Sequence, residues 1–90
     1  MFHVLICHDR PGALETRLAN RDAHLAYIRE TGVVAQAGPL LDADGGMAGS
    51  LVILDVPDLA AAESWAKSDP YALADLFASV EIRPWKRVIG

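Results

Sequence analysis

This 90-residue chain has few of the features that mark an exported, membrane-bound or nucleic-acid-binding protein. Its one cysteine, Cys7, cannot form a disulfide within the chain, which is typical of a reducing compartment such as the cytoplasm. No apolar run approaches the roughly 18 residues of a transmembrane helix, and the first residues lack the basic start of a signal peptide. The sequence therefore predicts a cytoplasmic protein with no membrane association.

Basic residues and metal-binding patterns are also scarce. Eight Lys and Arg residues face twelve Asp and Glu, for a net charge of −4, whereas a nucleic-acid partner requires a basic surface. His3 and His8 would point to opposite sides of one strand, and no other group has the spacing of a closed zinc site. There is no P-loop or dinucleotide fingerprint. We expect neither a metal nor a cofactor, and no nucleic-acid partner.

Apolar residues, in contrast, make up 52% of the chain, and the mean hydropathy is +0.22. Ninety residues form one domain, residues 1–90, which has a large surface relative to its volume. An apolar surplus in so small a domain indicates that part of its surface is buried against another chain. We therefore expect an oligomer.

The order of the predicted elements indicates an α+β fold. Hydrophobic periodicity and turn residues predict four strands, at 2–8, 33–41, 47–56 and 77–88, and two helices, at 11–31 and 57–69, with a further helical turn at 71–76. This βαββαβ order is the split βαβ, or ferredoxin-like, plan. Two helices cover only one face of a four-stranded sheet, yet residues 51–54 are apolar on both faces. We therefore expect a homodimer whose sheets pack face to face.

The first predicted helix carries an unusual stripe. At 100° per residue its cations and histidine lie on the same side as its leucines and isoleucine, namely Arg17, Arg21 and His24 with Leu14, Leu25 and Ile28. Buried charge is costly unless it is paired or serves a ligand. The stripe therefore predicts a polar pocket beside the core.

His24 and Asp69 are the candidate catalytic residues. An imidazole exchanges protons near neutral pH, and a carboxylate at the end of the second helix could orient it. The spacing also allows a histidine that is merely hydrogen-bonded at a helix edge, with Asp69 capping the turn before Pro70.

Arg17 and Arg21 are candidates for binding a small organic anion. They lie four residues apart on one helix face, so they could clamp a carboxylate, enolate or phosphate. The alternative is that they form salt bridges with Glu15, Asp22 or a carboxylate of a partner chain.

Four further residues are candidates for the pocket wall. Ser50 lies within a strand, so we expect a hydrogen-bond donor rather than a nucleophile. Gly38 and Pro39 are expected to interrupt the strand edge and widen a cleft, although an edge bulge is an alternative. Tyr71 could contact a flat ligand, as could Tyr27, Trp65 and Trp85, although core or interface packing is the commoner role of such residues.

Several segments together resemble the YciI-like (YCII-related) family of small single-domain proteins. The matching residues run nearly end to end: Arg17, the segment 21–25 (RDAHL), the segment 37–41 (AGPLL), Gly49 and Ser50, Trp65, the segment 69–71 (DPY) and the segment 80–85 (VEIRPW). The resemblance implies a ferredoxin-like fold that dimerises as an α/β barrel. It also implies a pocket with a His–Asp pair, here His24 and Asp69, and with Ser50 at the site.

The resemblance also bears on activity. One relative is a dehydrochlorinase of a chlorinated hydroxyquinol, whereas most members have no assigned substrate. Asp75 stands where we would expect a glycine, which puts the shape of the loop near Tyr71 in question.

Three functions fit this sequence. The first is a small enzyme, an isomerase, lyase or dehydrochlorinase, that uses acid–base chemistry without a cofactor on a small anionic or aromatic substrate. The second is a non-catalytic module that binds a small ligand. The third is a structural dimer, in which His24 and Asp69 would lie too far apart to interact and no cavity would adjoin them.

Overall fold

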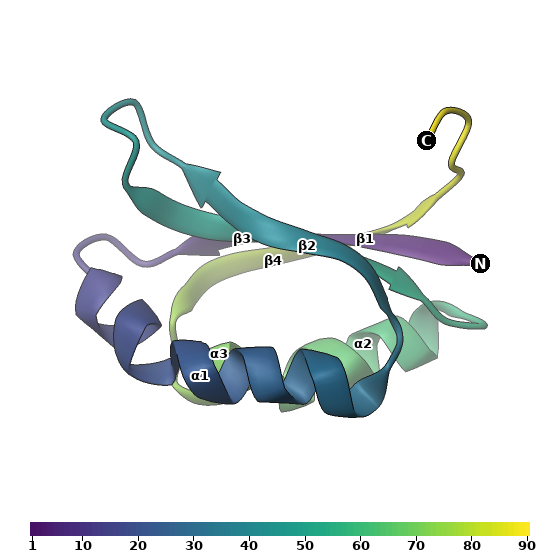
Figure 1. The fold of residues 1–90 in the computed structure, drawn as a ribbon, viewed down its shortest axis with the longest axis horizontal. Coiled ribbons are helices and arrows are strands. Elements are labelled where there is room, and N and C mark those ends of the chain that lie inside the picture. Colours follow the sequence, from purple (N-terminus) through teal and green to yellow (C-terminus); the bar gives the residue numbers. More distant parts are fainter.

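The sheet and the helices of this protein form two layers, which we describe from a computed structural model that covers all 90 residues. The strands are antiparallel and lie in the order β2-β3-β1-β4, with bounds β1 (Phe2–Asp9), β2 (Val34–Leu41), β3 (Met47–Asp55) and β4 (Phe77–Trp85). The helices α1 (Leu14–Thr31), α2 (Leu59–Ser68) and α3 (Pro70–Leu73) all lie on one side of the sheet (Figure 1). The α+β class and the split βαβ order are confirmed, because β3 lies between β1 and β2.

Local signals set most element boundaries. Gly32 ends α1 in the left-handed conformation, with φ 66°, and its N–H donates to the Ile28 carbonyl. Asp58 caps α2 by accepting a hydrogen bond from the Ala61 N–H at 2.8 Å. α1 begins at Leu14 rather than residue 11, and β4 ends at Trp85 rather than residue 88.

No helix is long and apolar enough to span a bilayer.

The predicted interruption of the second strand is wrong. β2 runs through Gly38 and Pro39, which pair with Leu51 and Ser50 without a register shift. The irregularities lie instead toward the two ends of the strand, between Val34 and Gln36 and between Leu40 and Leu41. Proline is tolerated because β2 is an edge strand and needs to pair on one side only.

The buried side of α1 is polar. Its two buried residues are Arg17 and His24, whereas Leu14 and Leu18 are 47% and 53% exposed. Leu14, which the helical spacing placed on the same side as these polar groups, is thus not buried with them. Burial of a guanidinium and an imidazole requires partners on the facing elements.

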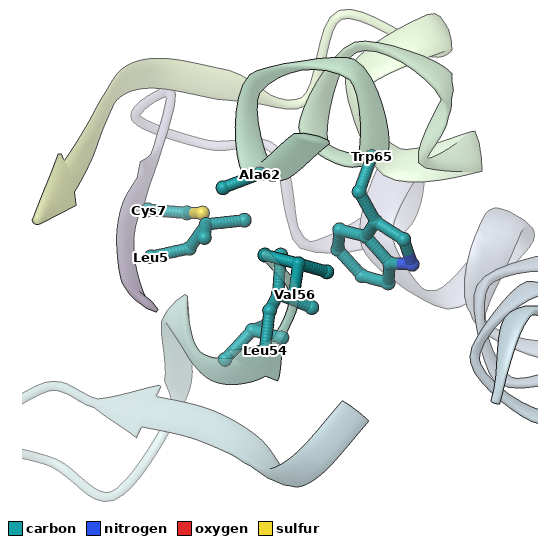
Figure 2. Packing of buried hydrophobic residues seen from close by; sticks show 7 residues of the cluster. Leu5, Cys7, Leu54, Val56, Ala62 and Trp65 are labelled. Carbon is teal, nitrogen blue, oxygen red and sulfur yellow. The ribbon is translucent and has the colours of Figure 1, made fainter. Parts of the chain in front are cut away.

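The main core lies under α2. Figure 2 shows Ala62 and Trp65 of α2 packed against side chains from β1 and from β3 and its end. The cluster comprises Leu5, Cys7, Val52, Leu54, Val56, Ala62 and Trp65. Burial, with a smaller contribution from the negative charge of Asp69, raises the pKa of the Cys7 thiol to about 12.

The opposite face of the sheet has no helix over it (Figure 1). Strand alternation places Phe2, Val4 and Ile6 of β1 on this face, opposite the helix-facing His3, Leu5 and Cys7. Leu51 of β3 lies there too and is 37% exposed, and Trp85 of β4 is 38% exposed and packs on Phe2. We call this surface the open face.

Asp75 adopts the conformation that favours glycine. It is the only non-glycine residue with positive φ, at 57°, and its carbonyl accepts a hydrogen bond from the Arg10 side chain. The turn between α3 and β4 is thus made by a residue whose Cβ atom makes the left-handed backbone conformation unfavourable.

Cys7 is expected to resist thiol reagents in the folded protein. Because only the thiolate reacts, a pKa near 12 predicts modification at pH 8 about three orders of magnitude slower than in the unfolded chain. Ellman's reagent, with and without denaturant, measures this ratio. The free energy of unfolding should also fall as the pH rises from 9 toward 12, because the folded state disfavours the thiolate. Rapid labelling of the native protein would contradict the prediction.

Asp75→Gly is expected to raise the free energy of unfolding by about 0.5–1 kcal/mol, because glycine removes the strain of the left-handed conformation. Asp75→Ala is the matched control and should lower stability, since alanine keeps the strain and lacks the carboxylate that lies 3.9 Å from Arg10 Nε. Urea denaturation measures both. Equal stability of the two variants would show that the backbone conformation at this position has little cost.

Candidate functional site

A pocket of about 200 Å³ lies between α1 and the β2 side of the sheet. Its polar lining comes from α1, β3 and α3, and comprises Arg17, Arg21, His24, Ser50 and Tyr71. Its remaining lining is apolar or backbone: Leu25, Ile28, Ala37, Gly38, Pro39, Met47 and Val52. The structure thus brings seven of the eight predicted site residues to one cavity.

The eighth, Asp69, lies behind His24. The two side chains are buried, and His24 Nδ1 lies 2.7 Å from Asp69 Oδ1. An ionised carboxylate only accepts hydrogen bonds, so Nδ1 carries the hydrogen and donates it. The other ring nitrogen, Nε2, makes no hydrogen bond within the chain and keeps its lone pair for the pocket that His24 lines.

Asp69 also sets the position of Tyr71. Its Oδ1 accepts a hydrogen bond from the Tyr71 N–H at 3.0 Å and so caps α3. The Tyr71 ring then stacks on the His24 imidazole, with centroids 4.0 Å apart and planes 15° apart. Burial raises the pKa of Tyr71 against the opposing charges of Arg17 and Arg21, so its hydroxyl remains a neutral phenol.

Arg17 is held by Asp9 and Ser50. Its Nε donates to Asp9 Oδ2 at 2.7 Å, and its Nη2 donates to Asp9 Oδ1 at 2.8 Å and to Ser50 Oγ at 2.9 Å. Burial opposes the charge on Arg17, but the hydrogen bonds and charge of Asp9 outweigh this effect and raise its pKa. The guanidinium also lies 4.7 Å from the centre of the Tyr71 ring.

Asp9 is the site residue that sequence reasoning missed. We expected the first strand to end at His8, which left Asp9 in the turn, but β1 includes Asp9. Continued alternation from Cys7 would have placed Asp9 on the helix-facing side. The alternative that Arg17 forms a salt bridge is correct, although its partner is Asp9 rather than Glu15 or Asp22.

The remaining candidate residues either line the pocket or pack elsewhere against other aromatic side chains. Arg21 is exposed at the pocket and makes no ion pair or hydrogen bond within the chain. Tyr27 and Trp65 pack on each other in the core at 4.9 Å, and Trp85 packs on Phe2. Tyr71 is therefore the one aromatic residue of the four that lines the pocket.

This geometry contradicts the purely structural alternative. That alternative required His24 and Asp69 to be apart and no cavity to adjoin them, whereas they are 2.7 Å apart beside a pocket. Ser50 Oγ contacts Arg17 and no base, so the site lacks an activated serine. No three His, Cys, Asp or Glu side chains gather as a metal site. The arrangement can hold a small ring on apolar side chains and move a proton at Nε2.

Comparisons with known proteins agree with this description. The sequence profile of the YCII-related domain matches residues 1–86. Protein YciI of Escherichia coli is 36% identical over an alignment of 97 positions, which covers 98% of this chain and 99% of the relative.

Solved structures extend the likeness to three dimensions. The 5-chloro-2-hydroxyhydroquinone dehydrochlorinase of Burkholderia phenoliruptrix, solved with 2,5-dihydroxybenzoquinone, is 34% identical, with a TM-score of 0.88 over 96% of this chain and 94% of that one. An antibiotic biosynthesis monooxygenase with a TM-score of 0.62 and 14% identity, covering 99% and 100% of the two chains, shares the fold alone. The profile match and the 36% identity over nearly the whole length show that the chain belongs to the family of YCII-related domains.

Proposed function

We propose that this protein is a small enzyme that catalyses cofactor-independent acid–base chemistry on a small anionic or aromatic substrate. The observation that carries the proposal is the 2.7 Å contact of His24 Nδ1 with Asp69, which leaves Nε2 for the pocket. A base that is oriented by a carboxylate and faces a ligand cavity is the usual arrangement for proton transfer. The unpaired thiol of Cys7 is in keeping with a reducing compartment such as the cytoplasm.

In this mechanism Nε2 of His24 removes a proton from the substrate, and the electron pair of the broken bond moves into the conjugated system. In an isomerisation, the imidazolium returns the proton to another atom of the substrate. In an elimination, a leaving group such as chloride departs with an electron pair, and the imidazolium later loses its proton to water. Asp69 orients the ring and stabilises the imidazolium that forms. Arg21 and Ser50, which line the same pocket, stabilise negative charge that develops on the substrate.

The similarity to a dehydrochlorinase supports elimination as the first reaction to test. That protein is named for a chlorinated hydroxyhydroquinone and was solved with 2,5-dihydroxybenzoquinone, which is a flat, single ring. A cavity of about 150 Å³ is known to hold benzene, so the 200 Å³ pocket here is of a size for one substituted ring. Apolar contacts from Leu25, Ile28 and Val52 suit such a ring.

A homodimer completes this proposal. The open face presents Phe2, Val4, Ile6 and Leu51 with no helix above them, and only the residues after β4 reach it, where the Arg87 guanidinium lies 5.0 Å from the centre of the Phe2 ring. Apolar sheet faces of this kind are normally covered, and a second copy packed face to face would cover both at once. Such a dimer has the α/β-barrel form that the family resemblance implies. A higher oligomer built from such dimers is the alternative.

The catalytic proposal predicts that His24→Ala lowers kcat by about 100-fold or more, because the base is lost. Asp69→Asn keeps an oxygen to cap Tyr71 and should also lower kcat, with a changed pH profile, because it removes the charge beside His24. Chlorinated hydroxyquinols and lactones are the substrates to assay, with 2,5-dihydroxybenzoquinone as a binding probe. Binding of the probe and the melting temperature serve as controls for correct folding.

Turnover that is unchanged in His24→Ala would refute the catalytic role. A wild-type protein that binds the probe but turns over none of these substrates, with binding retained in His24→Gln, would favour the non-catalytic ligand-binding module.

The dimer proposal predicts a mass of twice 9.7 kDa in sedimentation or light-scattering measurements. Leu51→Glu should give a monomer, because it places a charge at the centre of an apolar interface. Leu73→Glu is the matched control, since Leu73 lies on α3, on the helix side, and is 73% exposed. A wild-type monomer at every concentration, or equal masses for the two variants, would contradict the face-to-face dimer.

A further inference from the structure

The two arginines that line the pocket differ in how much charge they offer to a ligand. Arg17 and Asp9 are 3% and 6% exposed and share two hydrogen bonds, so the pair carries no net charge. A third N–H of Arg17 is bound to Ser50. Of the five N–H donors of Arg17, only the two on Nη1 remain without an acceptor. Arg17 therefore has little capacity left to bind an anion.

Arg21 lies one helical turn after Arg17 and lines the same pocket. No carboxylate lies within ion-pair distance of it, and it makes no hydrogen bond within the chain. It is exposed, so its charge is hydrated and accessible rather than fixed by the fold. Arg21 is thus the pocket cation whose charge is not already neutralised.

The orientation of the Ser50 hydroxyl is a second consequence of the Asp9–Arg17 pair. Its Oγ accepts a hydrogen bond from Arg17 Nη2, so the serine's own hydrogen must point away from the guanidinium. Ser50 is 4% exposed and lines the pocket. Its hydroxyl is therefore oriented as a donor by Arg17, which is in turn held by Asp9.

We propose that Arg21 selects an anionic ligand for this pocket, and that Asp9 and Arg17 are positioning residues that orient the Ser50 hydroxyl. The inference rests on the proposed function in that it concerns the same pocket, and it narrows the ligand class to a single ring or similar compact body that bears a negatively charged oxygen. That oxygen accepts from Arg21 and Ser50, while the apolar part lies on Leu25 and Ile28.

The test compares two probes of nearly the same shape, benzoate and the uncharged benzamide. The wild-type protein should bind benzoate more tightly, and the preference should shrink as salt is added, because Arg21 is exposed. Arg21→Gln should lower the affinity for benzoate by about tenfold and remove the salt dependence of benzoate binding. The affinity for benzamide should stay within about twofold of the wild-type value. Arg29→Gln is the matched control, since it removes the same charge from an exposed position on α1 that does not line the pocket. NMR titration of each probe into each of these three proteins measures all six affinities.

Arg17 needs a paired change, because removing it alone leaves a buried, unpaired Asp9 carboxylate that could prevent folding. Asp9→Asn combined with Arg17→Gln keeps the net charge. This double variant should bind both probes more weakly, through the loss of Ser50 orientation, while it keeps the benzoate-to-benzamide ratio. A ratio lost in the double variant but kept in Arg21→Gln would overturn the assignment, as would a wild-type protein with no preference for benzoate.

These binding ratios involve no turnover, so they separate this inference from the catalytic proposal. Loss of anion preference in Arg21→Gln supports the inference even if His24→Ala leaves turnover unchanged. Conversely, a catalytic His24 with no anion preference in the wild type would support the enzyme and refute the role of Arg21.

Discussion

One oxygen of Asp69 connects the parts of the candidate site. It accepts a hydrogen bond from the His24 imidazole of α1 and another from the backbone N–H of Tyr71, which begins α3. The first bond selects the tautomer that leaves Nε2 facing the pocket, and the second places the Tyr71 ring against the imidazole. Pro70 suits this position because it ends α2 and starts α3 at N1. The orientation of the proposed base and of its aromatic neighbour thus depends on a single carboxylate.

The buried residues of α1 are polar, whereas apolar side chains usually take this place in a small domain. α1 contributes Arg17 and His24 to its buried side, and each meets a carboxylate from a distant element. Such pairs contribute little net stability, but removing one partner is costly. These buried pairs therefore belong both to the candidate site and to the packing of the fold. Variants that keep the net charge of a pair separate its role in binding from its role in stability better than variants that remove one partner.

The sheet serves two purposes on its two faces. The helix-facing side carries the core under α2 and the pocket beside α1, while the open face carries apolar side chains with no helix over them. Residues 37–39 of β2 separate the pocket from a shallow groove on the open face, because they line both. This face accounts for part of the high apolar content of the sequence, because the helices cover only the other face of the sheet.

The amino-acid sequence by itself determined the order of elements and several of their ends. Gly32 and Asp58 act through contacts within a few residues, so helix termination and capping are readable from neighbours along the chain. Spacing also placed Arg17, Arg21 and His24 on one side of a helix. It left the partners of the arginines open and offered Asp69 for His24 as one of two alternatives, which the family resemblance then favoured. The tertiary structure alone decided that Arg17 pairs with Asp9, that Arg21 has no partner and that Leu14 and Leu18 are exposed. These outcomes depend on strand register and on how α1 lies across the sheet, and both arise from contacts between residues far apart in the chain that local patterns do not encode.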